Sequence, residues 1–361
     1  MATIHIHARD IMHHDAVGSF CRQVAVLLQD AGHPVRLWAE NTNVEAPHKV
    51  EDRRDFWDAV QPDDVIFFNH SIHDPVLERI AALPHRKVGY FHNVTPPELI
   101  EQADVATVEN CRLGLLERGV LGSFDVILAN SEASANCLLE GMTANDAARH
   151  RGRIVVCPPL VGADRWSKVI AEALVPSSAS VKMLFVGRLV PHKGVQEILE
   201  IAEALSNHVP SVELNIVGGP AGGAYVEALK EQARAVEERT STKVMVRHGI
   251  SDGELKALYE DTTICIAHST HEGFCIPALD ALAFDKPIFV TAVPAILEVL
   301  GEAALVIPKE DRVAAASVIA AFLQDKGLSS SHGELRRARF EELKRLADGE
   351  LILQALERVP A

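Results

Sequence analysis

Short runs of apolar residues alternate, along most of the chain, with longer stretches in which apolar positions recur every three to four residues. This pattern is typical of buried strands that alternate with amphipathic helices, and it predicts β-α-β units and parallel sheets. Between Ser19 and Ala31, for example, Phe20, Val24 and Leu28 share one helical face, and Gly32 ends the pattern. In the first half the predicted strands are Thr3–His7, Val35–Ala39, Val65–Asn69, Lys87–Phe91, Val126–Ala129 and Ile154–Cys157.

The alternation breaks between Pro158 and Ser180, where prolines and serines gather, and we expect a connector there with a short helix inside it. A second α/β series follows, and from about Leu335 a charged amphipathic helix ends the chain. The architecture we expect is two Rossmann-like domains that face each other across a cleft, with the ligand at the carboxyl ends of the strands. The predicted strands of the second series are Met183–Val186, Glu213–Val217, Lys243–Arg247, Thr263–Ala267, Pro287–Thr291 and Ala304–Ile307.

Length and composition agree with this architecture. The 361 residues suit two domains, and 48% apolar with 24% charged residues describes a well-packed globular protein, which excludes disordered and collagen-like classes. A net charge of −15 argues against a nucleic-acid partner, because phosphates attract a surplus of Lys and Arg. No apolar run approaches the ~20 residues of a membrane span, and the start lacks the core of a secretory signal, so we expect a cytoplasmic protein.

Two cations follow the first strand of the second series. Arg188 comes directly after Gly187, where the chain can turn tightly, and Lys193 comes five residues later. A guanidinium can bind two oxygens of a diphosphate while the lysine adds a mobile point charge. Two solvated loop cations would show the same spacing, so this pair alone does not settle the function.

A second candidate loop follows the strand Thr263–Ala267. Pro277 suits the first turn of a helix, and the N–H groups before it would then face an anion. Glu272 precedes this helix and Asp280 lies inside it, eight positions on, which at the helical rise separates them by up to ~12 Å. That span suits a nucleotide sugar, with one carboxylate on the sugar hydroxyls and the other on a ribose.

Together these two motifs, Gly187-Arg188-x4-Lys193-Gly194 and Glu272-Gly273-Phe274-x2-Pro277-x2-Asp280-Ala281, closely resemble the donor-binding half of glycosyltransferase family 4. The first half of the chain is similar to bacterial members that build lipopolysaccharide and other surface glycans. Its matching segments, in order, are Asp15–Gly18 (DAVG), Tyr90–Pro97 (YFHNVTPP), Val126–Ser131 (VILANS) and Pro158–Asp164 (PPLVGAD).

The resemblance implies the GT-B fold, in which two Rossmann-like parallel-sheet domains face each other. The acceptor-side domain would cover residues 1–165 and be completed by a C-terminal helix at about 340–361. The nucleotide-sugar domain would cover residues 166–339.

The resemblance also assigns roles to residues. It implies that Arg188 and Lys193 neutralise the donor diphosphate, and that Glu272 holds the donor sugar. It also implies that the backbone N–H groups of the three residues after Glu272 bind the β-phosphate. These residues are Gly273, Phe274 and Cys275.

Further positions follow from the same comparison. Gly18 would let its loop approach the phosphates, and His248 and Ile250 would flank the nucleobase. His92 would lie beside the reacting sugar and bind its hydroxyls. Asp280 stands where the family usually has its second Glu, and its carboxylate, shorter by one methylene, is expected to contact the ribose.

Acceptor residues are suggested by position alone. His13 and His14 precede the Gly18 loop, and His73 follows the strand Val65–Asn69, so all three are expected at the edge of the cleft. No metal is expected, because no Asp-x-Asp occurs in the chain and the histidines show no convincing ligand spacing.

The predicted activity is retaining transfer of a hexose from a nucleoside-diphosphate sugar, with GDP-mannose favoured over UDP-glucose, to a surface-glycan acceptor. The sequence identifies no carboxylate for a double displacement, and the resemblance implies front-face transfer with retention instead. A lipid-linked acceptor would bring the protein into peripheral contact with the inner face of the membrane. The alternatives are a phosphorylase or epimerase on the same fold, and a catalytically silent binding subunit of a glycan-assembly complex.

Overall fold

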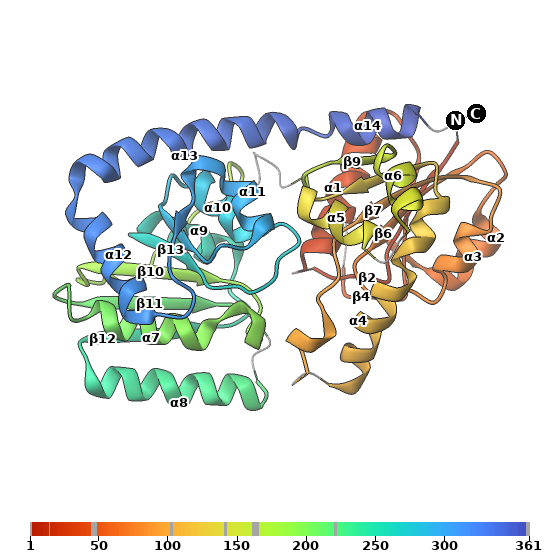
Figure 1. The fold of residues 1–361 in the computed structure, drawn as a ribbon. Helices are drawn as coiled ribbons and strands as arrows, with labels where there is room; N and C mark the ends of the chain where they lie inside the picture. Colours follow the sequence, from red (N-terminus) through yellow and green to blue (C-terminus); the bar gives the residue numbers. More distant parts are fainter. Residues whose placement is uncertain are drawn as a thin grey trace. The chain divides into compact units, whose positions relative to one another are not determined.

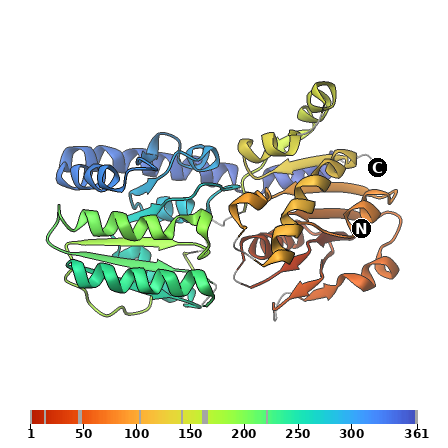
Figure 2. The same cartoon turned by 60° about the horizontal axis from the view of Figure 1, so that its bottom comes forward.

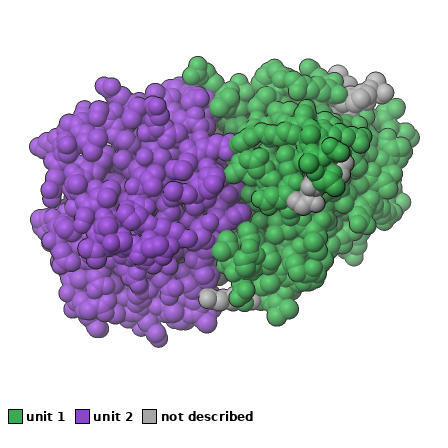
Figure 3. All heavy atoms as spheres, viewed as in Figure 1, with its two compact units in different colours: residues 1–162, 344–361 green, residues 163–343 purple. Residues whose placement is uncertain are grey.

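The structure, a computed structural model, describes residues 2–13, 15–44, 49–101, 104–140, 143–160, 166–219 and 222–358. The chain divides into two units, one formed by residues 1–162 and 344–361 and the other by residues 163–343 (Figure 3). The boundaries expected from the sequence were 165 and about 340.

Unit 1 is built on a parallel sheet whose strand order, among the described residues, is β5-β3-β1-β6-β7-β8-β9 (Figure 1). Strands β2 and β4 form a separate two-stranded parallel sheet. The strands are β1 (Ile4–His7), β2 (Asp10–Ile11), β3 (Val35–Ala39), β4 (Asn41–Thr42), β5 (Val50–Asp52), β6 (Val65–His70), β7 (Arg86–Phe91), β8 (Val126–Ala129) and β9 (Ile154–Val156). The helices are α1 (Ala16–Asp30), α2 (Phe56–Ala59), α3 (Leu77–Ala81), α4 (Val105–Glu117), α5 (Glu132–Leu139), α6 (Ala144–Arg151) and α14 (Glu350–Glu357).

All six strands predicted for the first half are confirmed, because each is a buried parallel strand and therefore reads as an apolar run. The predicted helix at residues 19–31 is also confirmed as α1, but it begins at Ala16. The Asp15 carboxylate accepts hydrogen bonds from the N–H groups of Val17 and Gly18 and so caps the helix earlier than the apolar pattern suggests.

The C-terminal helix α14 packs in unit 1. Ile352 and Ala355 are buried in the same apolar cluster as Phe20 and Val24 of α1. The sequence predicted one continuous helix here, which was wrong: α13 (Lys326–Leu346) ends first, and Gly349 (φ +94°) separates it from α14. A glycine reaches such a positive φ without the steric cost that a side chain would carry.

Unit 2 has a second parallel sheet, with the described strands in the order β12-β11-β10-β13-β14-β15. One face is covered by α7, α8 and α12, whose apolar side chains share a core with those of β10, β11 and β13 (Figure 2). The strands are β10 (Val181–Val186), β11 (Val212–Val217), β12 (Thr242–Arg247), β13 (Ile264–Ala267), β14 (Ile288–Val290) and β15 (Leu305–Val306). The helices are α7 (Val195–Leu205), α8 (Ala224–Arg239), α9 (Asp252–Asp261), α10 (Ile276–Ala283), α11 (Pro294–Leu300), α12 (Arg312–Gln324) and α13.

The six strands predicted for the second half are confirmed as β10 to β15. The short helix expected in the connector is not present in its described parts, residues 158–160 and 166–180, where residues 166–168 form a turn and no regular helix or strand follows. The described residues also contain no helix with both the length and the apolar character that a membrane span requires.

In each sheet, successive strands are added first on one side of the first strand and then on its other side, and the point where this order reverses is called a switch point. In unit 2 the chain runs from β10 outward to β12 and then returns to β13 on the other side of β10; in unit 1 it runs from β1 outward to β5 and returns to β6. The loops that follow β10 and β13, or β1 and β6, therefore diverge. Such switch points are where open α/β sheets bind ligands.

Candidate functional site

Two loops meet at the switch point of unit 2. The first follows β10 and ends in a 3₁₀ turn at Pro191–Lys193, and the second runs from His268 to Cys275 between β13 and α10. The N–H of Thr270 donates to the carbonyl of His192 at 2.9 Å, which joins the loops. Gly194 adopts φ +67°, and a Cβ there would lie 2.3 Å from the His268 carbonyl oxygen, so only glycine permits this contact.

This junction brings together two of the predicted donor-binding residues. Lys193 Nζ lies 2.6 Å from Glu272 Oε1, and both side chains are mostly buried, with 15% and 11% exposed. Ser269 Oγ donates to the same Glu272 oxygen at 2.7 Å. The Ser269 carbonyl in turn accepts from Thr291 Oγ1 at 2.6 Å. Lys193 and Ser269 therefore both hold the Glu272 carboxylate in place.

Arg188 lies on the loop after β10 and is exposed, and its guanidinium makes no hydrogen bond to any residue that the structure describes. The charge of Arg188 nevertheless affects the pKa of His192. Burial, together with smaller effects of the nearby Lys193 and Arg188 charges, lowers the pKa of His192 to about 3. The loop therefore carries two permanent cations beside a neutral imidazole.

The start of α10 is open in the way an anion site requires. Cys275 precedes the helix in the left-handed conformation (φ 78°), Pro277 lies in the first turn, and no side chain caps the helix. Phe274 and Cys275 are buried behind this start. First-turn N–H groups and the helix dipole favour a negative ligand here.

Asp280 lies deeper in α10 and is 3% exposed. Its Oδ1 accepts a hydrogen bond from the indole N–H of Trp166 at 2.9 Å. Lys256 holds the Trp166 segment in place, because its ammonium donates to the carbonyls of Trp166 and Val169 at 2.9 and 2.8 Å. The carboxylate thus has a role inside the unit, and its contact with a ribose stays a prediction.

His248 and Ile250 follow β12, on the same edge of the sheet as Arg188. His248 Nδ1 donates to the Gly218 carbonyl at 2.6 Å, while its Nε2 is buried with no partner in the described part of the chain. Gly218 also touches the loop after β10, since a Cβ there would lie 1.7 Å from the Gly187 oxygen. Gly218 thus links His248 to the Gly187 turn, a role the sequence analysis missed although two glycines follow an apolar strand there.

In unit 1, His92 follows β7. Its Nε2 lies 3.0 Å from Asn69 Oδ1, and because the Asn69 amide nitrogen donates to the His7 carbonyl, His92 Nε2–H is the donor in this contact. Burial lowers the pKa of His92 to about 3, with a smaller effect from His70. His92 is therefore a neutral imidazole whose Nδ1 can accept a hydrogen bond from a hydroxyl.

Gly18 lies in the first turn of α1, and a Cβ there would lie 2.2 Å from the Met12 carbonyl oxygen. The space above Gly18 is therefore occupied by the backbone of Met12, which Arg22 also holds by donating to its carbonyl at 2.9 Å. Its predicted approach to donor phosphates remains a prediction. His13 is exposed, with its N–H on Asn43 Oδ1 at 2.7 Å, and His14 lies outside the described residues.

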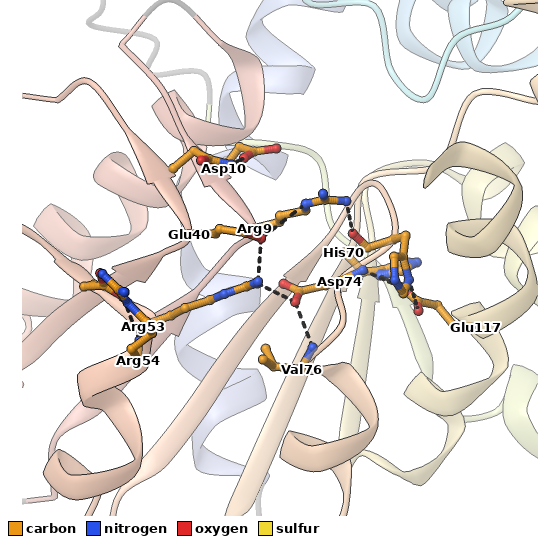
Figure 4. A network of polar contacts seen from close by, with 12 residues as sticks. Arg9, Asp10, Glu40, Arg53, Arg54, His70, Asp74, Val76 and Glu117 are labelled. Carbon is orange, nitrogen blue, oxygen red and sulfur yellow. Dashed lines mark hydrogen bonds and ion pairs between the residues drawn. The ribbon is translucent and has the colours of Figure 1, made fainter. Parts of the chain in front are cut away.

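His73 belongs to a polar cluster at the switch point of unit 1, most of which the sequence analysis missed. Figure 4 labels its members Arg9, Glu40, Arg53, Asp74 and Glu117. His73 Nδ1 lies 2.6 Å from Glu117 Oε2. The other members come from residues that follow different strands, and they are Arg9, Glu40, Arg53 and Asp74. No group of three or more His, Cys, Asp or Glu side chains in the described ranges is arranged to hold a metal ion.

Parts of the chain are similar in sequence to known glycosyltransferases. Residues 170–342 match the family described as glycosyl transferases group 1. A D-inositol 3-phosphate glycosyltransferase of Corynebacterium urealyticum is 26% identical over 223 residues, which are 58% of this chain and 51% of that protein. The O-antigen chain mannosyltransferase RfbU of Salmonella typhimurium is 29% identical over 164 residues, which are 45% of this chain and 44% of that protein. The matches thus span about half the length of these relatives.

The fold extends the likeness to the whole chain. WaaG, a glycosyltransferase involved in lipopolysaccharide biosynthesis, superposes with a TM-score of 0.71 at 14% identity, covering 96% of this chain and 98% of WaaG. The sucrose-phosphate synthase of Thermosynechococcus elongatus gives the same TM-score at 17% identity, covering 99% and 100%. The chain therefore has the two-domain GT-B fold, and its second unit is similar to the group 1 glycosyl transferases over residues 170–342.

Proposed function

We propose that this protein is a retaining glycosyltransferase that moves a hexose from a nucleoside-diphosphate sugar to a surface-glycan acceptor. The observation that carries the proposal is the contact between Lys193 and Glu272, made by two loops at the switch point of unit 2. It places a cation and a carboxylate side by side at the edge of the sheet where a nucleotide sugar would present its diphosphate and its hydroxyls.

Both groups keep binding capacity for a substrate. An ammonium has three N–H donors, and Lys193 uses one on Glu272. A carboxylate has about four acceptor positions, and Glu272 uses two on one oxygen, for Lys193 and Ser269. The donor can therefore bind without breaking the pair.

The reaction needs stabilisation of a leaving diphosphate. As the bond between the anomeric carbon and the phosphate oxygen breaks, negative charge grows on the diphosphate. Arg188, Lys193 and the open start of α10 would oppose that charge without a metal. In front-face transfer the departing phosphate oxygen accepts the proton of the attacking hydroxyl, so most of the catalysis lies in positioning and charge stabilisation. His92 would bind a hydroxyl of the reacting sugar through Nδ1.

The donor we favour is GDP-mannose rather than UDP-glucose, and the acceptor is a lipopolysaccharide or exopolysaccharide precursor, as the relatives' names suggest. A lipid-linked precursor would place this cytoplasmic enzyme at the inner face of the membrane. Co-sedimentation with vesicles of anionic lipid tests that placement.

The test of the activity is release of nucleoside diphosphate from GDP-mannose and UDP-glucose in a chelating buffer, without added acceptor, so that water takes the place of the acceptor hydroxyl. We expect release from one donor, reduced about a hundredfold or more in Glu272→Gln because the sugar loses a charged contact. Glu227→Gln is the matched control, since Glu227 is an exposed residue of α8 that pairs with Lys230.

The second candidate is a catalytically silent binding subunit, and the burial of Asp280 against Trp166 favours it, because the carboxylate expected at the ribose is engaged elsewhere. Nucleotide binding without release of diphosphate from either donor, in the presence of varied acceptors, would support this alternative and contradict the transferase.

A further inference from the structure

The strongest unassigned feature is the polar cluster at the switch point of unit 1 (Figure 4). Its members come together from the carboxyl ends of four neighbouring strands. Arg9 follows β1, Glu40 follows β3, Arg53 follows β5, and His73 with Asp74 follows β6, while Glu117 joins them from the end of α4. Ligands bind at this edge of open α/β sheets, so the cluster lies where unit 1 would hold one.

The buried half of the cluster is an ion-pair frame. Arg53 lies between Glu40 and Asp74, and its Nη1 donates to Asp74 Oδ1 at 2.8 Å (Figure 4). Glu117 accepts hydrogen bonds from His73 Nδ1 and from the Asp74 N–H at 2.6 and 2.7 Å. The frame fixes the side chains in front of it.

The accessible half consists of Arg9, His73 and Glu40, whose side chains are 21%, 24% and 41% exposed. Arg9 Nη1 donates to the His73 carbonyl at 2.8 Å, and its Nε lies 3.5 Å from Glu40 Oε2. Within the described residues, Arg9 Nη2, His73 Nε2 and Glu40 Oε1 make no hydrogen bond. A donor, an imidazole nitrogen and a carboxylate acceptor are thus presented together, which is the mixture that neighbouring hydroxyls of a sugar can satisfy.

The charges of the cluster disfavour an anionic ligand. Three carboxyl groups (Glu40, Asp74 and Glu117) accompany two guanidinium groups (Arg9 and Arg53), and each guanidinium already contacts a carboxylate. A phosphate binds where cations are in surplus, whereas here the carboxyl groups outnumber the guanidinium groups by three to two.

Asp74 supplies an independent indication. Its Oδ2 is buried and has no hydrogen bond in the described part of the chain. A buried acceptor without a donor is costly, and it is satisfied by a water or a ligand hydroxyl but not by a phosphate dianion, which has no proton to donate.

We propose that Arg9, Glu40 and His73 form the subsite for an uncharged, polyhydroxylated acceptor sugar, and that this site discriminates against phosphorylated acceptors. The inference rests on the proposed transferase function and names the chemical class of its acceptor. Glu40 is the residue that sets the discrimination, because it is the exposed carboxylate next to both guanidinium groups.

The experiment measures binding of methyl glucoside, methyl mannoside, methyl galactoside and their phosphate monoesters by ligand-observed NMR at millimolar concentration, without nucleotide. We expect a neutral glycoside to bind to the wild type more tightly than its phosphate monoester. In Glu40→Gln the difference should narrow, with the phosphate ester gaining about tenfold, because the variant leaves two guanidinium groups opposite two carboxyl groups. His73→Ala should weaken the neutral glycoside by about tenfold.

Arg54→Gln is the matched control, because Arg54 is an exposed neighbour of Arg53 that pairs with Asp52. Thermal unfolding of every variant shows whether the fold is retained. Tighter binding of the phosphate ester by the wild type, binding that His73→Ala leaves unchanged, or no binding of any of these probes would each overturn the proposal. Because Arg188, Lys193 and Glu272 lie in unit 2 and nucleotide is absent, failure here leaves the nucleotide-binding tests of the proposed function unaffected.

Discussion

Glu272 is the residue on which the account of the donor site depends. One of its oxygens accepts from Lys193 and Ser269, which leaves the other oxygen facing away from these donors. Ser269 is itself 1% exposed, so its hydroxyl cannot be replaced there by bulk water. The orientation of the carboxylate is therefore set by a residue that would not touch the substrate.

Ser269→Ala should consequently lower donor turnover without unfolding the protein. Removing a hydrogen bond to a charged group costs about 1.5–3 kcal/mol, which corresponds to about a tenfold to hundredfold loss in kcat/KM. The assay is diphosphate release at several donor concentrations. Ser206→Ala, which removes a hydroxyl from the end of α7, should change nothing, and an unaltered rate in Ser269→Ala would show that Glu272 needs no such support.

Because several histidines are buried as neutral imidazoles, we expect the protein to lose stability in mild acid. Burial lowers the pKa of His7 and His92 to about 3 and that of His70 to about 4, from 6.5. As the pH falls below 6.5 the unfolded chain takes up protons that the folded one does not, so stability present above pH 6.5 is lost progressively towards pH 3.

Lowering the pH from about 7.5 to about 5.5 should therefore reduce the free energy of unfolding by about 1.4 kcal/mol for each of these histidines. Urea unfolding at the two pH values measures the loss. His92→Gln should show a smaller loss than the wild type, whereas replacing the exposed His208 should not. An equal midpoint at both pH values would contradict the burial of neutral imidazoles.

At the scale of elements, the strand ends and their loops decide what the site can do. The loop after β10 can lie against the end of β13 only because Gly194 has a positive φ and no Cβ. The two loops then share the hydrogen bond from Thr270 to His192. The distance between Lys193 and Glu272 is thus a property of the packing of two loops rather than of either loop alone.

Gly194→Ala should separate these loops. The strained φ and the contact with the His268 carbonyl should together destabilise the protein by about 1–3 kcal/mol and weaken nucleotide binding, because Lys193 precedes the displaced turn. Chemical unfolding and nucleotide titration provide the two readouts. Gly152→Ala, where a Cβ would meet nothing, is the control, and wild-type affinity in Gly194→Ala would show that the loop junction is not needed.

A strand or helix could be predicted where its burial requires a recognisable pattern of apolar residues in the local sequence. The predicted strands were found because buried parallel strands are continuous apolar runs, whereas β5, with the sequence Val-Glu-Asp at a half-buried sheet edge, leaves no such run. The break before α14 was missed because its only local signal is Gly349.

The same distinction holds for the site. Arg188, Lys193 and Glu272 stand in motifs, so sequence alone could propose them. Ser269 lies only three residues before Glu272, but its contact with the carboxylate depends on the conformation of the loop. Arg9 and His73 are far apart in the chain, and their contact is set by the tertiary fold.

At the scale of the whole molecule, each unit carries a polar site at the switch point of its own parallel sheet. The unit 2 site has exposed or spare cations and the start of α10, which suits a diphosphate. The unit 1 site has its guanidinium groups matched by carboxylates, which suits an uncharged sugar. The opposite electrostatic character of the two sites agrees with a reaction between an anionic donor and a neutral acceptor.

The most direct test of the central claim is calorimetric titration of GDP and UDP into the wild-type protein and into Arg188→Ala, with a chelator present. The account predicts micromolar binding of one nucleotide to the wild type, unchanged by the chelator and weakened at least about tenfold in the variant, because the guanidinium contacts the diphosphate. Binding of neither nucleotide, or binding that Arg188→Ala leaves intact, would contradict a donor site at the switch point of unit 2.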